Sequence, residues 1–127
     1  MSAATILIVE DDAAIRKALK DKLEFEKFGV LEAINGAVGL DLALKKHPDM
    51  ILLDLVMPTM DGFTALKALR ADSWGKNAQV IALTNVNDND KVAAMIESGV
   101  YEYIVKTDWK IENVVAKVKE KLSVPAA

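Results

Sequence analysis

The sequence of 127 residues contains no cysteine, few aromatic residues and no long apolar run. Without cysteine, thiol catalysis, cysteine-based zinc sites and disulfide scaffolds are excluded. No apolar run approaches the roughly 20 residues that span a bilayer, so we expect no transmembrane helix and no membrane partner. The first residues lack the positively charged region and long apolar core of a secretory signal, which predicts a cytoplasmic protein.

An excess of basic residues is also missing, since 19 acidic residues stand against 16 lysines and arginines, for a net charge of -3. Neutralising phosphates requires clustered Lys and Arg, so we expect no direct nucleic-acid partner. Hydrophobic residues make up 52% of the chain, which at this length can bury a sizeable core. We therefore expect a single domain over residues 1–127, with its core at about 5–122.

The hydrophobic residues form short aliphatic runs separated by amphipathic segments. Near-continuous apolar runs are typical of buried parallel strands. They occupy residues 5–9, 30–34, 50–53, 80–83 and 100–105, the last of which we expect at an edge of the sheet. Between these runs, apolar residues recur with the period of a helix. The predicted helices lie around residues 15–23, 37–44, 63–69, 92–96 and 111–122.

Chain-breaking residues agree with these boundaries, because Gly29 is placed to end the first helix and Pro48 the second. Strands that alternate with helices through short connections predict an α/β fold with a doubly wound, five-stranded parallel sheet and helices on both faces. The pattern alone does not determine the order of the strands in the sheet.

Polar side chains stand at the carboxyl ends of the predicted strands, where open parallel sheets bind ligands. These residues are Glu10, Asp11, Asp12, Asn35, Asp54, Thr84 and Lys106. Crowded carboxylates favour a hard cation, and Mg²⁺ suits Asp11 and Asp54. Lys106 offers a positive charge to an anion, and Thr84 offers a hydroxyl donor. Asp12 is interpreted as a helix N-cap, and a turn that begins at Asp54 is a structural alternative for that residue.

Several segments occur together in a specific order. They are Ile-Leu-Ile-Val-Glu-Asp-Asp at 6–12, Asp-Leu-Val-Met-Pro-Thr-Met-Asp-Gly at 54–62, Thr84, Ser-Gly-Val at 98–100 and Tyr-Ile-Val-Lys at 103–106. With these segments the chain resembles, from Ile6 to Leu122, the receiver domains of two-component response regulators, including the small chemotaxis regulator. The resemblance implies a flavodoxin-like sheet with strand order 2-1-3-4-5.

The resemblance also implies roles for individual residues around a Mg²⁺ ion. Asp54 corresponds to the phosphoryl acceptor and Asp11 to the direct magnesium ligand. Glu10 corresponds to the outer-shell partner of the metal, and the backbone carbonyl of Val56 to the third protein ligand.

Further residues correspond to the parts of the family that respond to phosphorylation. Lys106 matches the residue that pairs with the acceptor and then with the phosphoryl group. Thr84 and Tyr103 match the pair of switch residues, while Pro58 and Gly62 match residues that shape the loop after the acceptor.

By resemblance, the protein is expected to be a signalling switch rather than an enzyme, although it assists its own phosphorylation and dephosphorylation. It would take a phosphoryl group from a sensor histidine kinase or a phosphotransfer protein. The change would reach a downstream effector protein through the surface formed by the helix near 92–96, the strand 100–105 and the helix 111–122. A monomer or a phosphorylation-dependent dimer is expected.

The sequence departs from the family pattern after Lys106, where Thr107 replaces a proline whose preceding bond is usually cis. A cis bond before a residue other than proline costs about 3–4 kcal/mol, so the loop has either that bond or another path. An alternative function is a receiver-like interaction module that works without phosphorylation. A nucleotide- or flavin-binding module disagrees with the acidic residues at 10–12. A metal-dependent phosphohydrolase would need a second carboxylate two residues after Asp54, where this chain has Val56.

Overall fold

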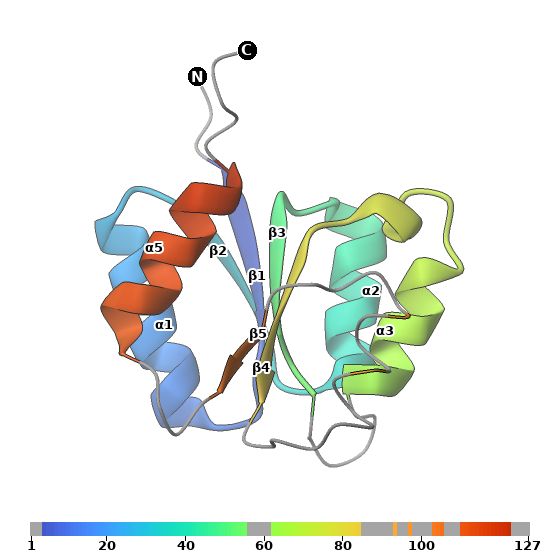
Figure 1. Ribbon diagram of the computed structural model, residues 1–127, viewed down its shortest axis with the longest axis horizontal. Helices are drawn as coiled ribbons and strands as arrows, with labels where there is room; N and C mark the ends of the chain where they lie inside the picture. Colours follow the sequence, from blue (N-terminus) through green and yellow to red (C-terminus); the bar gives the residue numbers. More distant parts are fainter. Residues whose placement is uncertain are drawn as a thin grey trace.

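The alternating segments form a five-stranded sheet with helices on both faces in a computed structural model of the protein (Figure 1). The structure describes residues 4–55, 62–84, 93, 97, 103–105 and 110–122, and only the backbone of residues 63, 84 and 103–105. The strands are β1 (Thr5–Val9), β2 (Gly29–Ala33), β3 (Met50–Asp54), β4 (Val80–Thr84) and β5 (Tyr103–Val105). The helices are α1 (Ala13–Phe25), α2 (Gly36–Lys46), α3 (Gly62–Arg70), the short 3-10 helix η1 (Gly75–Asn77) and α5 (Ile111–Leu122).

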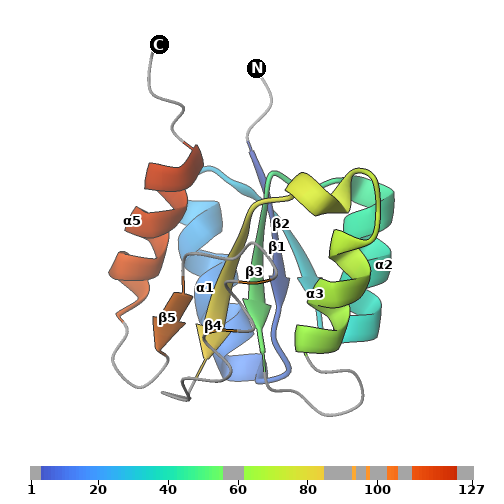
Figure 2. The same ribbon diagram turned by 45° about the vertical axis from the view of Figure 1, so that its right-hand side comes forward.

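The strands lie in the order β2-β1-β3-β4-β5, and every neighbouring pair is parallel. This confirms the doubly wound fold and the strand order that the resemblance implied. Figure 2 shows β5 beside β4 at one edge of the sheet, where an edge strand was expected. The helix predicted near 92–96 falls mostly outside the described residues, although Ala93 and Glu97 beside it are helical.

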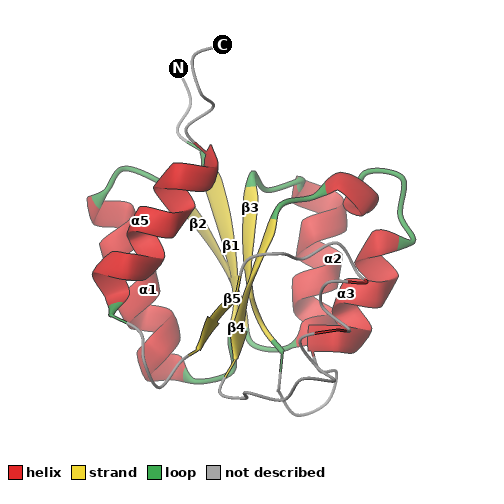
Figure 3. Ribbon diagram, in the orientation of Figure 1, coloured by secondary structure: helices red, strands yellow, loops and turns green. Residues whose placement is uncertain are grey.

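Alternate side chains of the strands point to opposite faces of the sheet and build two separate cores. On one face, Ile6, Ile8 and Leu52 pack with α1 and α5. On the other face, Leu7 and Leu53 pack with α2 and α3. Figure 3 shows the two helix layers on either side of the strands. Among the helices in the described ranges, none is long and apolar enough to cross a membrane.

The end of α1 corrects one prediction from the sequence. Gly29 does not end the helix, because it is the first residue of β2. The chain turns instead at Lys27, whose φ of 75° lies in the left-handed region. The amides of Lys27 and Phe28 donate to the carbonyls of Glu24 (2.9 Å) and Leu23 (3.0 Å), which satisfies the last carbonyls of the helix. Two hydrogen bonds and the packing of Phe28 against the core therefore compensate for a lysine in a conformation that favours glycine.

The end of α2 also uses a left-handed residue, His47, with φ 48° directly before Pro48. The His47 ring stacks on the indole of Trp74, with ring centroids 4.3 Å apart and planes inclined by 9°. Arg70 stabilises the same region, since its guanidinium donates to the carbonyls of Gly75 (2.7 Å) and Ala78 (2.8 Å). Burial lowers the pKa of this guanidinium from its ordinary value. The connection from α3 to β4 is thus anchored by one cation and one aromatic stack.

Helix α2 lies unusually close to the sheet at Gly39. A Cβ atom at this position would be 2.7 and 2.9 Å from the two methyl groups of Val9, which is 1% exposed. The close approach of α2 therefore depends on the absence of a side chain at position 39.

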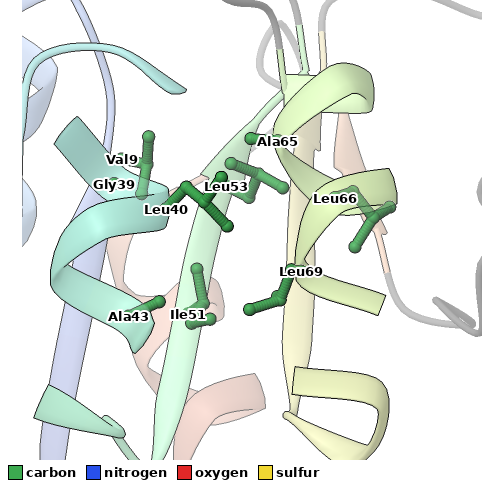
Figure 4. Close-up of a pocket in the computed structure, with 9 residues that line it drawn as sticks. All are labelled: Val9, Gly39, Leu40, Ala43, Ile51, Leu53, Ala65, Leu66 and Leu69. Atoms are coloured by element: carbon green, nitrogen blue, oxygen red, sulfur yellow. The ribbon is translucent and has the colours of Figure 1, made fainter. Parts of the chain in front are cut away.

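The neighbouring space between α2, α3 and the sheet holds an apolar cavity of about 10 Å³ (Figure 4). This volume has room for about one water molecule, and its apolar lining gives a water no hydrogen-bond partners.

We expect Gly39→Ala to destabilise the protein, although alanine favours a helix by about 1 kcal/mol over glycine. Val9 is β-branched and buried, so it cannot yield easily, and overpacking costs about 1–3 kcal/mol. Urea unfolding measures the net loss. In a Val9→Ala background the two contacts below 3.0 Å are gone and only the Cβ of residue 9 remains, at 3.3 Å, so the same substitution is expected to cost much less. A Gly39→Ala effect that is unchanged by Val9→Ala would contradict this explanation.

The two helices on the other face, α1 and α5, are joined by an ion pair between Glu26 and Lys119. The Lys119 ammonium donates to the Glu26 carboxylate, and this hydrogen bond lowers the pKa of that carboxyl below its ordinary value of 4.5. The Lys22 ammonium nitrogen lies 3.9 Å from Oε2 of the same carboxylate. Both groups remain accessible to solvent, so salt screens the pair.

A pKa that is lower in the folded protein stabilises the fold above the ordinary pKa and loses that contribution as pH falls through the folded value. Glu26→Gln is therefore expected to lower the urea midpoint slightly at pH 7. The difference from wild type should shrink as pH falls below about 4.5 and also shrink in high salt. Lys17→Met, which breaks an exposed pair within α1, is the matched control without a link between helices. An equal difference at pH 7 and at pH 3 would argue against the ion pair.

Candidate functional site

The carboxyl ends of β1 and β3 lie side by side at the lower edge of the sheet in Figure 1. In the parallel register Val9 pairs with Leu53, so the next residues on the two strands are Glu10 and Asp54. Asp11 follows in the connection to α1. Two buried strands therefore deliver acidic residues to the same place.

Glu10, Asp11 and Asp54 form a cluster in which one carboxylate oxygen of each lies within 4.8 Å of the others. Glu10 is 0% exposed and Asp54 is 3% exposed, while Asp11 is open to solvent. The cluster is thus a partly buried acidic site with one exposed side through which an ion or a ligand can enter.

Like charges this close repel each other strongly. At 4.8 Å and an effective dielectric of about 20, two unit charges repel by about 3.5 kcal/mol. A divalent cation bound between the carboxylates would offset this repulsion. Oxygen donors are the ligands that hard cations such as Mg²⁺ prefer, and Mg²⁺ binds through one or two carboxylates while it keeps waters. The donor set of the cluster therefore fits the ion that the sequence predicted.

Hydrogen bonds hold the acidic residues that follow β1 in place. The Glu10 amide donates to the carbonyl of Ala33 (3.0 Å), and Glu10 Oε2 accepts from the amide of Asp12 (3.1 Å). Asp12 Oδ1 accepts from the amides of Ala14 (2.9 Å) and Ile15 (3.1 Å) at the start of α1. This confirms Asp12 as the N-cap, which separates its role from that of the cluster.

The start of α3 lies close to the backbone of Asp54 and Leu55. The Leu55 amide donates to the carbonyl of Leu83 (3.1 Å), and the Gly62 amide donates to the carbonyl of Leu55 (3.1 Å). A Cβ atom at Gly62 would lie only 2.2 Å from the carbonyl oxygen of Asp54 and 2.6 Å from Leu55 Cα. Gly62 thus allows α3 to begin directly against the acidic residue.

Asn35 stands at the same edge but serves a helix. Its Oδ1 accepts from the amide of Val38 (2.9 Å), which makes Asn35 the N-cap of α2. Its position at the end of the second predicted strand did not indicate this capping role.

Other predicted site residues are placed only through the backbone or fall outside the described residues. Thr84 ends β4 opposite Val105, and Tyr103 begins β5 opposite Ala82. The predictions for Val56, Pro58, Lys106 and Thr107 concern residues outside the described ranges.

Arg16 contacts the acidic segment and was missed by the sequence analysis. Its Nη1 donates to the backbone carbonyl of Glu10 at 2.8 Å, and its Nε lies 3.3 Å from Glu32 Oε1 on β2. An arginine in the first turn of the helix after an acidic run is a signal that was present in the sequence. The target of that arginine became visible only in the structure.

Comparisons with known proteins agree on one family. Residues 6–119 match the model of the response regulator receiver domain. The chain is 36% identical over 118 residues to the DNA-binding dual master transcriptional regulator RpaA of Synechocystis sp., covering 92% of this chain and 48% of that protein. It is 37% identical over 102 residues to the transcriptional regulatory protein AfsQ1 of Streptomyces coelicolor, covering 80% and 44%. The chain spans about half the length of these curated relatives.

Solved structures give the same result. A CheY-like receiver domain protein from Methanospirillum hungatei superimposes with a TM-score of 0.88 at 29% identity, covering 95% of this chain and 94% of the other. The chemotaxis protein CheY4 of Vibrio cholerae superimposes with a TM-score of 0.87 at 28% identity, covering 94% and 99%.

The contact at Gly62 predicts that Gly62→Ala disturbs both the fold and the acidic cluster. The new Cβ would meet backbone atoms of Asp54 and Leu55, which cannot rotate away, so we expect a loss of about 1–3 kcal/mol in urea unfolding. Gly29→Ala is the matched control, because a Cβ there would lie at an ordinary 3.5 Å from Thr5 Oγ1. Equal effects of the two substitutions would show that α3 is not packed tightly against Asp54.

Proposed function

Because this chain belongs to the family of response regulator receiver domains, we propose that it is a phosphorylation-controlled switch whose phosphoryl acceptor is Asp54. The cluster of Glu10, Asp11 and Asp54, with carboxylate oxygens within 4.8 Å of one another, carries this proposal. Asp54 is the member of the cluster that ends a central strand, and its burial keeps bulk water away from most of its side chain. Asp11 leaves the cluster open on one side.

In the proposed reaction, a carboxylate oxygen of Asp54 attacks the phosphorus of a phosphohistidine on a partner protein. The new P–O bond forms as the P–N bond breaks, and the partner's imidazole leaves and takes up a proton. Asp11 and Asp54 would hold a Mg²⁺ ion together with the carbonyl of Val56, and Glu10 would stand in the outer shell of the metal. When bound, Mg²⁺ neutralises charge on the carboxylates and the phosphoryl oxygens. Lys106 would add a positive charge beside the transferred group.

The response to phosphorylation is proposed to pass through Thr84 and Tyr103. The Thr84 hydroxyl would donate to the new phosphoryl group, and Tyr103 would move into the space that Thr84 leaves. Thr84 pairs with Val105 and Tyr103 with Ala82, so the two residues lie two positions apart on the neighbouring strands β4 and β5, which supports a link through these strands. The affected surface would comprise the helix predicted near 92–96, β5 and α5.

The proposed partners are a sensor histidine kinase or phosphotransfer protein and a downstream effector protein, in the cytoplasm. We propose that residues 1–127 form one receiver domain, as a monomer or a phosphorylation-dependent dimer. The absence of a direct nucleic-acid partner stays a prediction for these residues, since a relative named as DNA-binding is matched over 48% of its length.

The decisive experiment incubates the protein with Mg²⁺ and a small-molecule acyl phosphate and measures intact mass. Wild type is expected to gain one phosphoryl group, and Asp54→Asn is expected to gain none. The matched control is Asp41→Asn, which removes an exposed aspartate paired with Lys45 on α2 and should react like wild type. EDTA should prevent the reaction in every variant.

Failure of the wild-type protein to gain mass, with folding intact, would replace this proposal by its alternative, an interaction module that works without phosphorylation. A gain by Asp54→Asn equal to that of wild type would assign the acceptor to another residue.

A further inference from the structure

We propose that Arg16 is a positioning residue that holds the Glu10–Asp11 segment in the geometry needed to bind the metal ion. This inference rests on the proposed function, because it concerns the same acidic cluster. Arg16 lies on α1 and has a side chain that is 18% exposed. Among the described residues, its hydrogen bond to the cluster is made to the backbone carbonyl of Glu10 and not to a carboxylate.

The Arg16 guanidinium bridges two neighbouring strands, because it contacts one residue near the end of each. Nη1 donates to the Glu10 carbonyl at the end of β1 (2.8 Å), and Nε faces the Glu32 carboxylate on the neighbouring β2 (3.3 Å). The planar guanidinium fixes the relative direction of these two contacts. Glu32 therefore orients Arg16, and Arg16 orients the Glu10 carbonyl.

The Glu10 carbonyl belongs to the peptide that joins Glu10 to Asp11. A hydrogen bond to this oxygen sets the plane of that peptide, and the plane determines the direction in which the Asp11 backbone continues. On its other side, Asp11 is followed by Asp12, which caps α1. The exposed Asp11 side chain thus starts from a backbone that is anchored at both neighbours.

The charge of Arg16 alone would have the opposite effect on a metal ion. A positive charge near a cation site repels the cation, although the nearby Glu32 carboxylate reduces this repulsion. If charge dominated, removal of Arg16 would tighten metal binding. If positioning dominates, removal of Arg16 weakens it. The sign of the change separates the two explanations.

The test measures Mg²⁺ binding to the full chain by isothermal titration calorimetry. We expect Arg16→Met to raise the Mg²⁺ dissociation constant about 10-fold, as typical for the loss of a residue that orients metal ligands. Arg16→Lys and Glu32→Gln keep part of the contact and should show smaller increases. The matched control is Lys17→Met, which removes the same charge one residue further along α1 and leaves the Glu10 carbonyl untouched.

A second readout uses the metal-free protein in EDTA. Amide hydrogen exchange at Glu10 and Asp12 should become faster in Arg16→Met, because these amides, which donate to the Ala33 carbonyl and to Glu10 Oε2, flank the peptide that Arg16 holds. The amides of β3 serve as the internal reference, since general destabilisation would accelerate them as well. If Arg16→Met does not fold, Mg²⁺ binding and amide exchange are both measured on Arg16→Lys and Glu32→Gln.

Weaker Mg²⁺ binding with faster exchange confined to the Glu10–Asp12 segment would support the inference. Binding as tight as in wild type, or tighter, would overturn it, and so would exchange that accelerates equally in β3. If wild type binds no Mg²⁺, the magnesium part of the proposed function fails. Unchanged exchange at Glu10 and Asp12 would then overturn the role of Arg16, and locally faster exchange would support it.

Discussion

The structure depends on the parallel pairing of β1 with β3, because this register forces acidic residues together at one edge of the sheet. Val9 and Leu53 are partners in the ladder, so Glu10 and Asp54 emerge side by side. Both are almost completely buried, and the repulsion between their carboxylates is not relieved by distance. The favourable burial of both apolar strands maintains a charge arrangement that would be unfavourable in isolation. Such an arrangement creates a place for a cation.

Close packing and hydrogen bonds surround this edge of the sheet. Gly62 brings the start of α3 against the carbonyl of Asp54, and Gly39 brings α2 against the side chain of Val9, the residue before Glu10. The Arg16 side chain donates to the Glu10 carbonyl, and the Asp12 amide donates to the Glu10 carboxylate. These contacts restrict the backbone around Glu10 and Asp54 before any ion binds. Preorganisation of this kind reduces the cost of ordering ligands when an ion arrives.

Much of the fold could be predicted because its signals are local. Apolar runs marked the strands, helical periodicity marked the helices, and Asp12 before an apolar face marked the start of α1. Boundaries were less accurate, as the second strand was expected at 30–34 and lies at Gly29–Ala33. The left-handed turn at Lys27 after α1 could not be predicted, since lysine has no preference for that conformation and two hydrogen bonds together with the packing of Phe28 stabilise it there. The stack of His47 on Trp74 joins residues far apart in the sequence and carried no local signal.

The fold class and the acidic residues at the strand ends could be predicted from local patterns, because periodicity and residue type act within a few positions of each other. The burial of Glu10 and Asp54 and the exposure of Asp11 became evident only when the strands and helices packed together. The tertiary structure also decided that Arg16 reaches the Glu10 carbonyl and Glu32 at once. Burial and such contacts depend on which helix covers which strand end. That depends on the packing of the whole sheet and is not encoded in any single segment.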